Sequence, residues 1–136
     1  MCYYIRILQK RWYIKDLGRF ASAAFRNYGG GISVIQNRCI SASGVEVCEH
    51  LKRYYCSVDQ PPHIFWRFQK NVFPEDCSFQ QKDSPTGDLC HYDIVGLSNG
   101  KAKRILNEFN DPINVFEICD NSNPRKLTES DLSGIQ

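Results

Sequence analysis

The segment Cys90-His91-Tyr92-Asp93 offers the most versatile side chains of this 136-residue chain. If the segment is a strand, His91 and Asp93 point to the same face, because successive side chains alternate. A histidine beside a carboxylate can act as a general base or accept a metal ion. Cys90 points to the opposite face, so a Cys–His nucleophilic pair is not expected. The alternative is that His91 hydrogen-bonds a loop and orders the edge of a sheet.

Two arginines, a serine and a glycine run form a second candidate site. Arg19, Ser22 and Arg26 precede the run Gly29-Gly30-Gly31. Backbone N–H groups of a glycine-rich turn can bind anions, and arginine adds charge and a forked donor. We therefore expect Arg19, Arg26, Gly30 and Gly31 to contribute to a phosphate or dinucleotide site. The spacing matches neither GxGxxG nor the P-loop pattern, and the alternative is a turn without a ligand.

Positive charge is concentrated in the first 38 residues. They contain seven cations and one anion, whereas the remaining residues contain ten cations and fourteen anions, for a net charge of +2. This asymmetry predicts an acidic or phosphate-bearing partner that is bound through Arg11 and its basic neighbours. Seven aromatic residues alternate with these cations, as in proteins that stack single-stranded nucleic acid. The alternative is that the aromatic side chains build the core and the cations form a solvated face.

The seven cysteines show no CxxC spacing, and no dedicated metal site is expected. Cys48 and His50 would diverge by about 200° around a helix. The N-terminal residues lack the apolar region of a signal peptide, and no apolar run approaches the about 20 residues that span a membrane. We therefore expect a cytoplasmic protein without a membrane segment, whose cysteines are reduced and mostly buried.

Six segments have the composition of strands. Aromatic and β-branched residues dominate in most of them, and loop-forming residues separate several of them. The expected strands cover residues 3–8, 32–35, 63–68, 77–81, 91–96 and 113–118.

Two segments have the apolar periodicity of helices. Ser43 and Glu46 fit a capping box at the start of a helix over residues 44–56, whose apolar face includes Leu51. Ser98 is the expected N-cap of a second helix, which includes Ile105 and ends before Pro112.

Together these elements predict an α+β fold. We expect a single domain over residues 1–119, with a mixed or antiparallel sheet of five or six strands and two main helices packed on it. Residues 120–136 contain few large apolar side chains and are expected to form a mobile tail.

Two stretches resemble a group of small uncharacterised bacterial proteins. SAAFRNYGGGISVIQNRC resembles their S-x-x-A-F-[RK]…G-[LI]-S-V segment, and CHYDIVGLSNGKAKRIL resembles their later H-A-x-I-x-G segment. This chain departs from the group by Tyr92 in place of alanine and by its long glycine run. The resemblance implies a bacterial cytoplasmic accessory protein of a multi-gene, defence-type system. It marks Ser22, Phe25, Ser33 and His91 as positions to test.

The chain also resembles small ADP-ribosyltransferase-type toxins in its order of residue types. Those proteins begin with a strand arginine, continue to a serine-bearing strand and end with a carboxylate on a late strand. The resemblance implies NAD as cofactor, with Arg6 or Arg11, Ser22 and Glu117 in these roles.

Our leading hypothesis is an interaction module without a cofactor, which docks a protein or an anionic partner, such as nucleic acid, through its basic N-terminal part. The chain contains no Ser-His-Asp elbow, HExxH or EF-hand pattern. The alternative is a nucleotide-using enzyme of ADP-ribosyltransferase or NAD-cleaving type. Its candidate catalytic residues are Ser22, His91 and Glu117.

Overall fold

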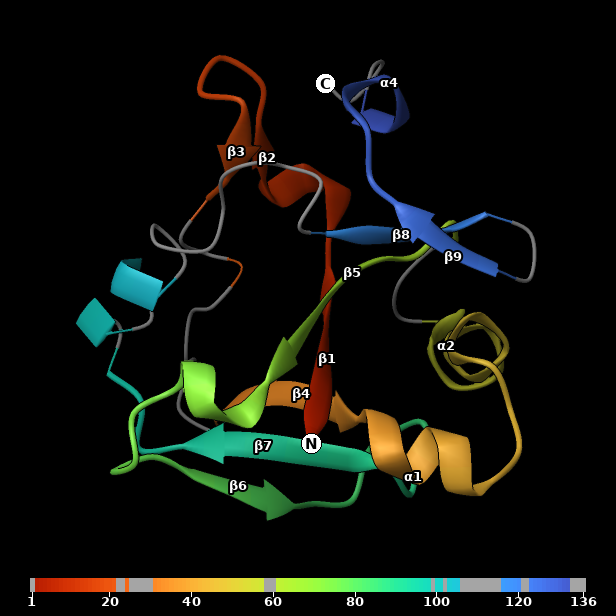
Figure 1. The fold of residues 1–136 in the computed structure, drawn as a ribbon, viewed down its shortest axis with the longest axis vertical. Helices are drawn as coiled ribbons and strands as arrows, with labels where there is room; N and C mark the ends of the chain where they lie inside the picture. The colour runs from red at the N-terminus through yellow and green to blue at the C-terminus, as the bar shows by residue number, and fades with distance from the viewer. Residues whose placement is uncertain are drawn as a thin grey trace.

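A seven-stranded sheet in the order β6-β7-β4-β1-β5-β8-β9 forms the centre of the structure. The computed structural model describes residues 2–21, 24, 31–57, 61–98, 100–101, 103–105, 116–120 and 123–132. The strands of the sheet are β1 (Tyr3–Leu8), β4 (Ile32–Gln36), β5 (Ile64–Gln69), β6 (Ser78–Gln81), β7 (His91–Val95), β8 (Glu117–Asp120) and β9 (Asn123–Lys126). Each neighbouring pair is antiparallel. Two short strands, β2 (Tyr13–Ile14) and β3 (Arg19–Phe20), form a separate hairpin at the top of Figure 1.

The predicted α+β class is confirmed, with more strands than the five or six expected. Five predicted strands correspond to β1, β4, β5, β6 and β7, with ends that agree to within one residue. The sixth corresponds to β8, and residues 113–115 of that prediction lie outside the described residues.

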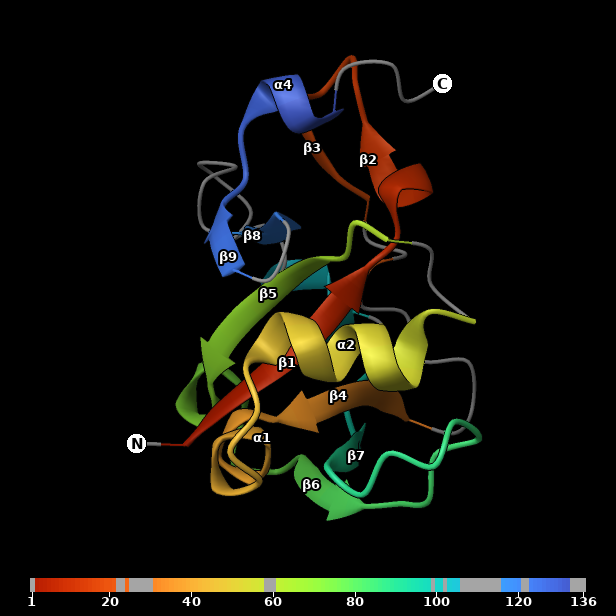
Figure 2. The ribbon, with the colours of Figure 1, turned by 90° about the vertical axis from the view of Figure 1, so that its right-hand side faces the viewer.

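One face of the sheet is covered by α1 (Asn37–Ala42) and α2 (Val47–Tyr55), which Figure 2 shows in front of β1 and β4. The predicted apolar face of α2 is confirmed, because Val47, Leu51 and Tyr55 are buried. Leu51 belongs to a core cluster with Ile5 and Phe65 of the sheet. No helix among the described residues has both the length and the apolar character needed to cross a membrane.

The predicted capping box at Ser43 and Glu46 is wrong. Ser43 is the C-cap of α1, and its hydroxyl donates to the Ile40 carbonyl at 2.7 Å. Gly44 follows with φ +75°, a conformation that favours glycine and ends helices. Glu46 is the N-cap of α2 and makes no side-chain capping bond. The Ser-Gly signal therefore belongs to the end of α1, a helix that the sequence analysis did not predict.

The opposite face of the sheet packs against an aromatic core. Tyr4, Trp66 and Phe68 from the sheet meet Phe20 and Phe116 there. The predicted helix cap at Ser98 is confirmed, since its Oγ accepts the Lys101 N–H at 3.2 Å. Ile105 is buried as predicted, and residues 106–109 of this helix lie outside the described residues.

Two disulfides contradict the expectation of reduced thiols. Cys39 of α1 is bonded to Cys90, just before β7, and Cys48 of α2 is bonded to Cys119 of β8. They link both helices to the sheet. The remaining cysteines, Cys2, Cys56 and Cys77, are free. Sequence spacing gave no sign of this pairing, because the partners are 51 and 71 residues apart.

The prediction of a mobile tail is wrong for residues 123–132. β9 pairs with β8 from Asp120↔Asn123 to Glu117↔Lys126, and the short helix α4 (Glu129–Leu132) follows it. Leu127 and Leu132 are 0% and 3% exposed. β9 is a polar edge strand, a position that tolerates Pro124 and needs no apolar alternation. Its composition therefore gave no strand signal.

Candidate functional site

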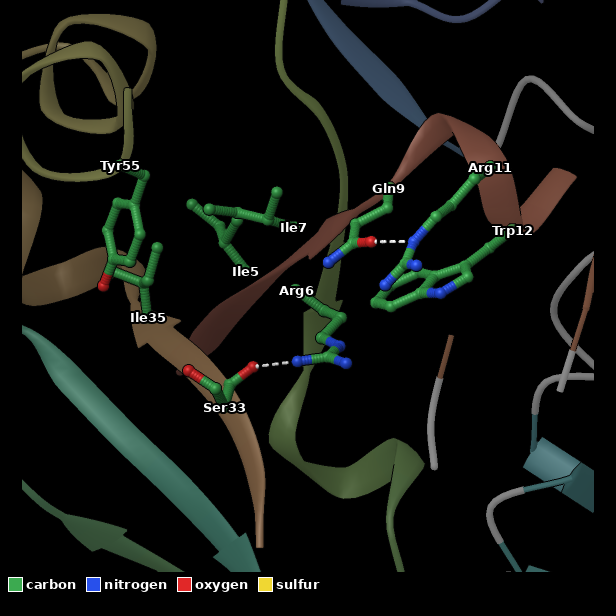
Figure 3. A pocket seen from close by; sticks show the side chains of 9 residues that line it. All are labelled: Ile5, Arg6, Ile7, Gln9, Arg11, Trp12, Ser33, Ile35 and Tyr55. Carbon is green, nitrogen blue, oxygen red and sulfur yellow. Dashed lines mark hydrogen bonds between the residues drawn. The ribbon is translucent and has the colours of Figure 1, made fainter. Parts of the chain in front are cut away.

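A cavity opens where β1 and β4 separate. Their ladder contains the pairs Tyr4↔Gln36 and Ile5↔Ile35, whereas β1 stays paired with β5 as far as Leu8. β4 meanwhile follows β7 back to Ile32. The cavity has a volume of about 310 Å³ and is shown in Figure 3. It is lined by Ile5, Arg6, Ile7, Gln9, Arg11, Trp12, Ser33, Ile35 and Tyr55.

Arg6 bridges the gap between the separated strands. Its Nε donates to the Ala24 carbonyl and its Nη1 to the Ser33 carbonyl, each at 2.9 Å. The Arg6 guanidinium also lies 5.4 Å from the centre of the Trp12 ring, within the range of a cation–π contact. The Arg6 side chain thus donates to two backbone carbonyls near the cavity, and these bonds hold its guanidinium at the cavity wall.

A second arginine, Arg11, stands at the mouth of the cavity. It belongs to the 3-10 turn η1 (Lys10–Trp12), is exposed, and donates through Nε to Gln9 Oε1. In the described part of the chain, Lys10, Arg11, Lys15, Arg19 and Arg38 form no ion pair with a carboxylate. Several acids of the later sequence instead pair with cations of that same part, as in Lys101–Asp76 and Arg67–Glu117. The charge of these five side chains is therefore not cancelled by direct pairing with a carboxylate of the described residues.

A buried polar cluster fixes the Tyr55 wall of the cavity. Tyr55 Oη donates to Asp88 Oδ2 at 2.5 Å, His50 Nε2 lies 2.9 Å from Asp88 Oδ1, and the Cys90 N–H donates to the same oxygen at 2.8 Å. Burial acts to raise the pKa of Asp88, but the hydrogen bonds from His50, Tyr55 and Cys90 outweigh it and hold the pKa below its usual value. Asp88 is thus a carboxylate that anchors α2 to the loop before β7.

Ser33 and His91 form a hydrogen-bonded pair at the same cavity. Ser33 Oγ lies 2.6 Å from His91 Nε2, and His91 Nδ1 lies 3.0 Å from the Lys82 carbonyl oxygen. A carbonyl oxygen only accepts, so this contact assigns the proton of a neutral ring to Nδ1. Nε2 then carries the lone pair and accepts the Ser33 hydroxyl proton. Ser33 is exposed, whereas His91 is buried.

The prediction that His91 and Asp93 share a face of β7 is confirmed. His91 Nε2 and Asp93 Oδ1 are 3.5 Å apart. Ser33 is the cross-strand partner of Asp93, which brings all three side chains to one face of β4 and β7. Ser33 was marked only through a resemblance, because its contact with His91 joins residues 58 positions apart on two paired strands.

Gly31 has a steric role at this site. Its φ is +100°, and a Cβ there would lie 3.0 Å from the Ile94 carbonyl oxygen and 3.1 Å from Asp93 Cβ. Glycine therefore allows the start of β4 to approach β7 closely, one residue before Ile32 enters the ladder. This approach supports the alignment of Ser33 with Asp93.

Among the other predicted site residues, the two that the structure describes, Arg19 and Glu117, do not line the cavity. Arg19 is exposed on β3 and is absent from the cavity lining, and Ser22, Arg26 and Gly30 lie outside the described residues. Glu117 of β8 accepts two hydrogen bonds from Arg67 of β5, at 3.0 and 3.2 Å. The described residues thus place Glu117 in an ion pair away from the cavity.

One group of side chains has the donors for a metal site. Atoms of His50, Asp88 and Cys90 lie within 4.8 Å of one another. Cys90 is bonded to Cys39, however, and a disulfide sulfur is not a thiolate ligand. Cys48 and His50 also diverge as predicted, since Cys48 pairs with Cys119 and His50 contacts Asp88.

A second cavity, of about 520 Å³, is less suited to chemistry. It is bordered by Lys70, Phe79 and Cys77, and Lys70 Nζ lies 5.4 Å from the Phe79 ring centre. Burial, and then the charge of Asp76, raise the pKa of the Cys77 thiol. That thiol is therefore poorly ionised at neutral pH and is a weak nucleophile.

Comparison of this chain with protein-family models, with curated proteins and with solved structures finds no match.

Proposed function

We propose that this protein binds an anionic ligand in the cavity between β1 and β4. The observation that carries the proposal is the cavity lining, which combines Arg6 and Arg11 with Trp12 and contains no carboxylate among the described residues. Guanidinium groups bind carboxylates and phosphates through paired, charge-assisted hydrogen bonds. This proposal develops the hypothesis of a module that recognises an anionic partner through its basic N-terminal part.

The lining also limits the class of ligand. A volume of about 310 Å³ lies at the lower end of the range for small-molecule sites. The Trp12 ring and the Tyr55, Ile5 and Ile7 side chains offer apolar contact beside the two cations. These features suit a compact ligand with one phosphate or carboxylate and a flat or apolar part. The ligand can be a free metabolite, or its anionic group can be the exposed end of a macromolecule.

The β2–β3 hairpin extends the basic surface beyond the cavity. Lys15 and Arg19 are exposed on it, and Leu17 near its turn is 60% exposed. A larger partner, protein or nucleic acid, can therefore contact the hairpin while its anionic group occupies the cavity. We also propose that the protein is a bacterial accessory protein of a multi-gene, defence-type system.

The disulfides favour an oxidising compartment over the cytoplasm that the sequence predicts. Structural disulfides persist in oxidising compartments and are rare where thioredoxin and glutathione keep thiols reduced. Alkylation of thiols in intact cells before lysis tests this choice. Modification of Cys2, Cys56 and Cys77 alone supports the oxidising compartment. Modification of all seven cysteines supports the cytoplasm.

Calorimetric titration with AMP and with inorganic phosphate tests the binding site. We expect saturable binding of both, tighter for AMP because its base can stack on Trp12. Loss of one charged hydrogen bond in Arg11→Ala should weaken binding about tenfold or more. Arg38→Ala removes the same charge from an exposed position outside the lining and should have less than about a twofold effect. Absence of saturable binding, or equal losses in both variants, contradicts the proposal.

The NAD-using alternative has one supporting feature. Arg6 lies on β1 at the cavity wall, as the likeness to ADP-ribosyltransferase-type toxins requires of the strand arginine. Against it, the ion pair of Glu117 with Arg67 holds the proposed carboxylate elsewhere. Incubation with NAD, with released nicotinamide as the readout, separates this alternative from simple binding. Release that is lost in Glu117→Gln supports the enzyme, and no release removes it.

A further inference from the structure

We infer that Ser33 is a nucleophile activated by His91, and that the cavity is a site of ester hydrolysis. The substrate is a carboxylic ester with an anionic group. The substrate class rests on the proposed binding function, because the anionic group would be held by Arg6 and Arg11. The Ser33–His91 pair itself is a separate observation from another pair of strands.

The hydrogen bonds of His91 give its ring the orientation of a general base. The Lys82 carbonyl holds Nδ1 at 3.0 Å and turns the Nε2 lone pair toward Ser33 Oγ at 2.6 Å. In this arrangement the histidine can take the hydroxyl proton without moving. Lys82 is itself fixed, since its N–H donates to the His91 carbonyl at 3.3 Å.

Asp93 supplies the charge that the protonated ring needs. Its Oδ1 is 3.5 Å from His91 Nε2, and its side chain is only partly exposed. When Nε2 accepts the serine proton, the resulting imidazolium lies beside this carboxylate and is stabilised by it. Asp93 is therefore a positioning residue that acts through His91.

The burial pattern places the reactive atoms correctly for an incoming substrate. His91 is 7% exposed, whereas Ser33 is exposed and lines the cavity. Arg6 Nη1 contacts the Ser33 main-chain oxygen at 2.9 Å, which brings a positive charge to the nucleophile's own residue. Figure 3 shows the guanidinium beside the Ser33 main-chain oxygen, with the Ser33 hydroxyl on the far side of the residue. The Arg6 charge therefore lies at the cavity wall, where it can attract the anionic group of the substrate.

The reaction balances with water as its only co-reactant. Ser33 Oγ bonds to the ester carbonyl carbon while its proton passes to His91 Nε2. The carbon–oxygen bond to the alcohol then breaks, and Nε2–H returns the proton to the leaving oxygen. Water, deprotonated by Nε2, attacks the acyl-serine, the bond to Oγ breaks, and Oγ regains the proton. The products are one carboxylic acid and one alcohol, with no change of oxidation state.

Covalent labelling with an alkyl fluorophosphonate tests the nucleophile. This probe forms a bond from the serine oxygen to phosphorus and releases fluoride. Peptide mass spectrometry should place the added mass on Ser33 and show none in Ser33→Ala, which removes the hydroxyl and its hydrogen bond to His91. His91→Gln should slow labelling about 100-fold or more, the usual contribution of a general base. Ser78→Ala, an exposed strand serine bonded to Gln80, should label like the wild type.

Turnover of two esters separates this inference from the binding function. Neutral p-nitrophenyl acetate and anionic p-nitrophenyl hemisuccinate are compared in the wild type and in Arg11→Ala. A loss of about tenfold for the anionic ester alone supports both proposals. Hydrolysis that Arg11→Ala leaves unchanged for both esters keeps the nucleophile but contradicts the anion site. No hydrolysis and no labelling of Ser33, or equal labelling of Ser33→Ala, overturns the nucleophile even when AMP binds.

Discussion

Arg6 shows how one side chain can replace part of a sheet. Where β1 and β4 separate, its guanidinium donates to the Ala24 and Ser33 carbonyls at 2.9 Å. The bond to the Ala24 carbonyl is partly buried, and a buried backbone acceptor without a partner is costly. Arg6 thus supplies side-chain donors at the point where the ladder between β1 and β4 ends. Its long reach is a property that the alternation of a strand sequence does not reveal.

Asp88 makes a pH-dependent contribution to stability. Its pKa is lower in the folded protein than the unfolded value of about 3.9, because three hydrogen bonds outweigh the effect of burial. The stability that Asp88 contributes is present above about pH 4 and is lost as the pH falls through the folded-state pKa. Urea unfolding should thus show a free energy that declines below pH 4.

The Asp88→Asn variant isolates this contribution. At pH 7 we expect it to lower the free energy of unfolding by about 1–3 kcal/mol, because charge-assisted bonds from His50 and Tyr55 become neutral. The difference from the wild type should narrow as the pH falls below 4. Asp83→Asn, in the exposed loop nearby, is the control. A constant difference between the wild type and Asp88→Asn across the acidic range would contradict this assignment.

The helix α2 is held to the sheet by packing and by a covalent bond. Leu51 is 0% exposed in its core cluster, and Cys48 is bonded to Cys119 of β8. This disulfide closes a loop of 71 residues, for which loss of chain entropy in the unfolded state predicts a stabilisation of about 4 kcal/mol. Replacement of both Cys48 and Cys119 by serine should therefore lower the free energy of unfolding by about 4 kcal/mol. Chemical denaturation measures it, with Cys56→Ser, an exposed free cysteine, as control.

The C-terminal element contributes to the core despite its polar composition. Leu127 is 0% and Leu132 3% exposed, and each buried leucine contributes about 1.5–3 kcal/mol. Removal of residues 122–136 should therefore lower the free energy of unfolding by about 3–6 kcal/mol, instead of the small change expected for a mobile tail. Leu127→Ala alone should lower the free energy of unfolding by about 2–5 kcal/mol. Glu129→Ala, at an exposed position, should change it little. A truncated chain with an unchanged melting temperature would contradict the packing.

Local patterns predicted those elements whose residues carry their own signal. The strand β1 was predicted from the segment YYIRIL, and α2 from the apolar face around Leu51. In both, the periodicity of the apolar residues matches the face that the element buries. β9 is a polar edge strand and α1 has only six residues, so neither has a clear local pattern. The Cys48–Cys119 disulfide joins residues 71 positions apart, which no local pattern predicts. His91 and Asp93 were found by alternation within one strand. Ser33 joined them only through the register of β4 with β7.

The charge distribution of the whole molecule leads to a prediction on polyanions. The first 38 residues carry seven cations and one anion, and the described acids of the later sequence that form ion pairs do so with cations of that later part. If the basic surface meets phosphates, each neutralised contact on a single strand releases counterions and adds about 0.7 to the salt slope. Binding of labelled single-stranded RNA should therefore weaken steeply as the salt concentration rises.

Charge reversal locates the surface that is responsible. Lys15→Glu with Arg19→Glu, on the β2–β3 hairpin, removes two cations and should reduce the salt slope by about 1.4. Lys103→Glu with Arg104→Glu changes the total charge equally but acts on exposed residues of the acidic part, and should leave the slope nearly unchanged. Equal effects of the two double variants would mean that net charge alone drives binding. No binding at low salt would remove nucleic acid as a partner and leave the small anionic ligand or a protein.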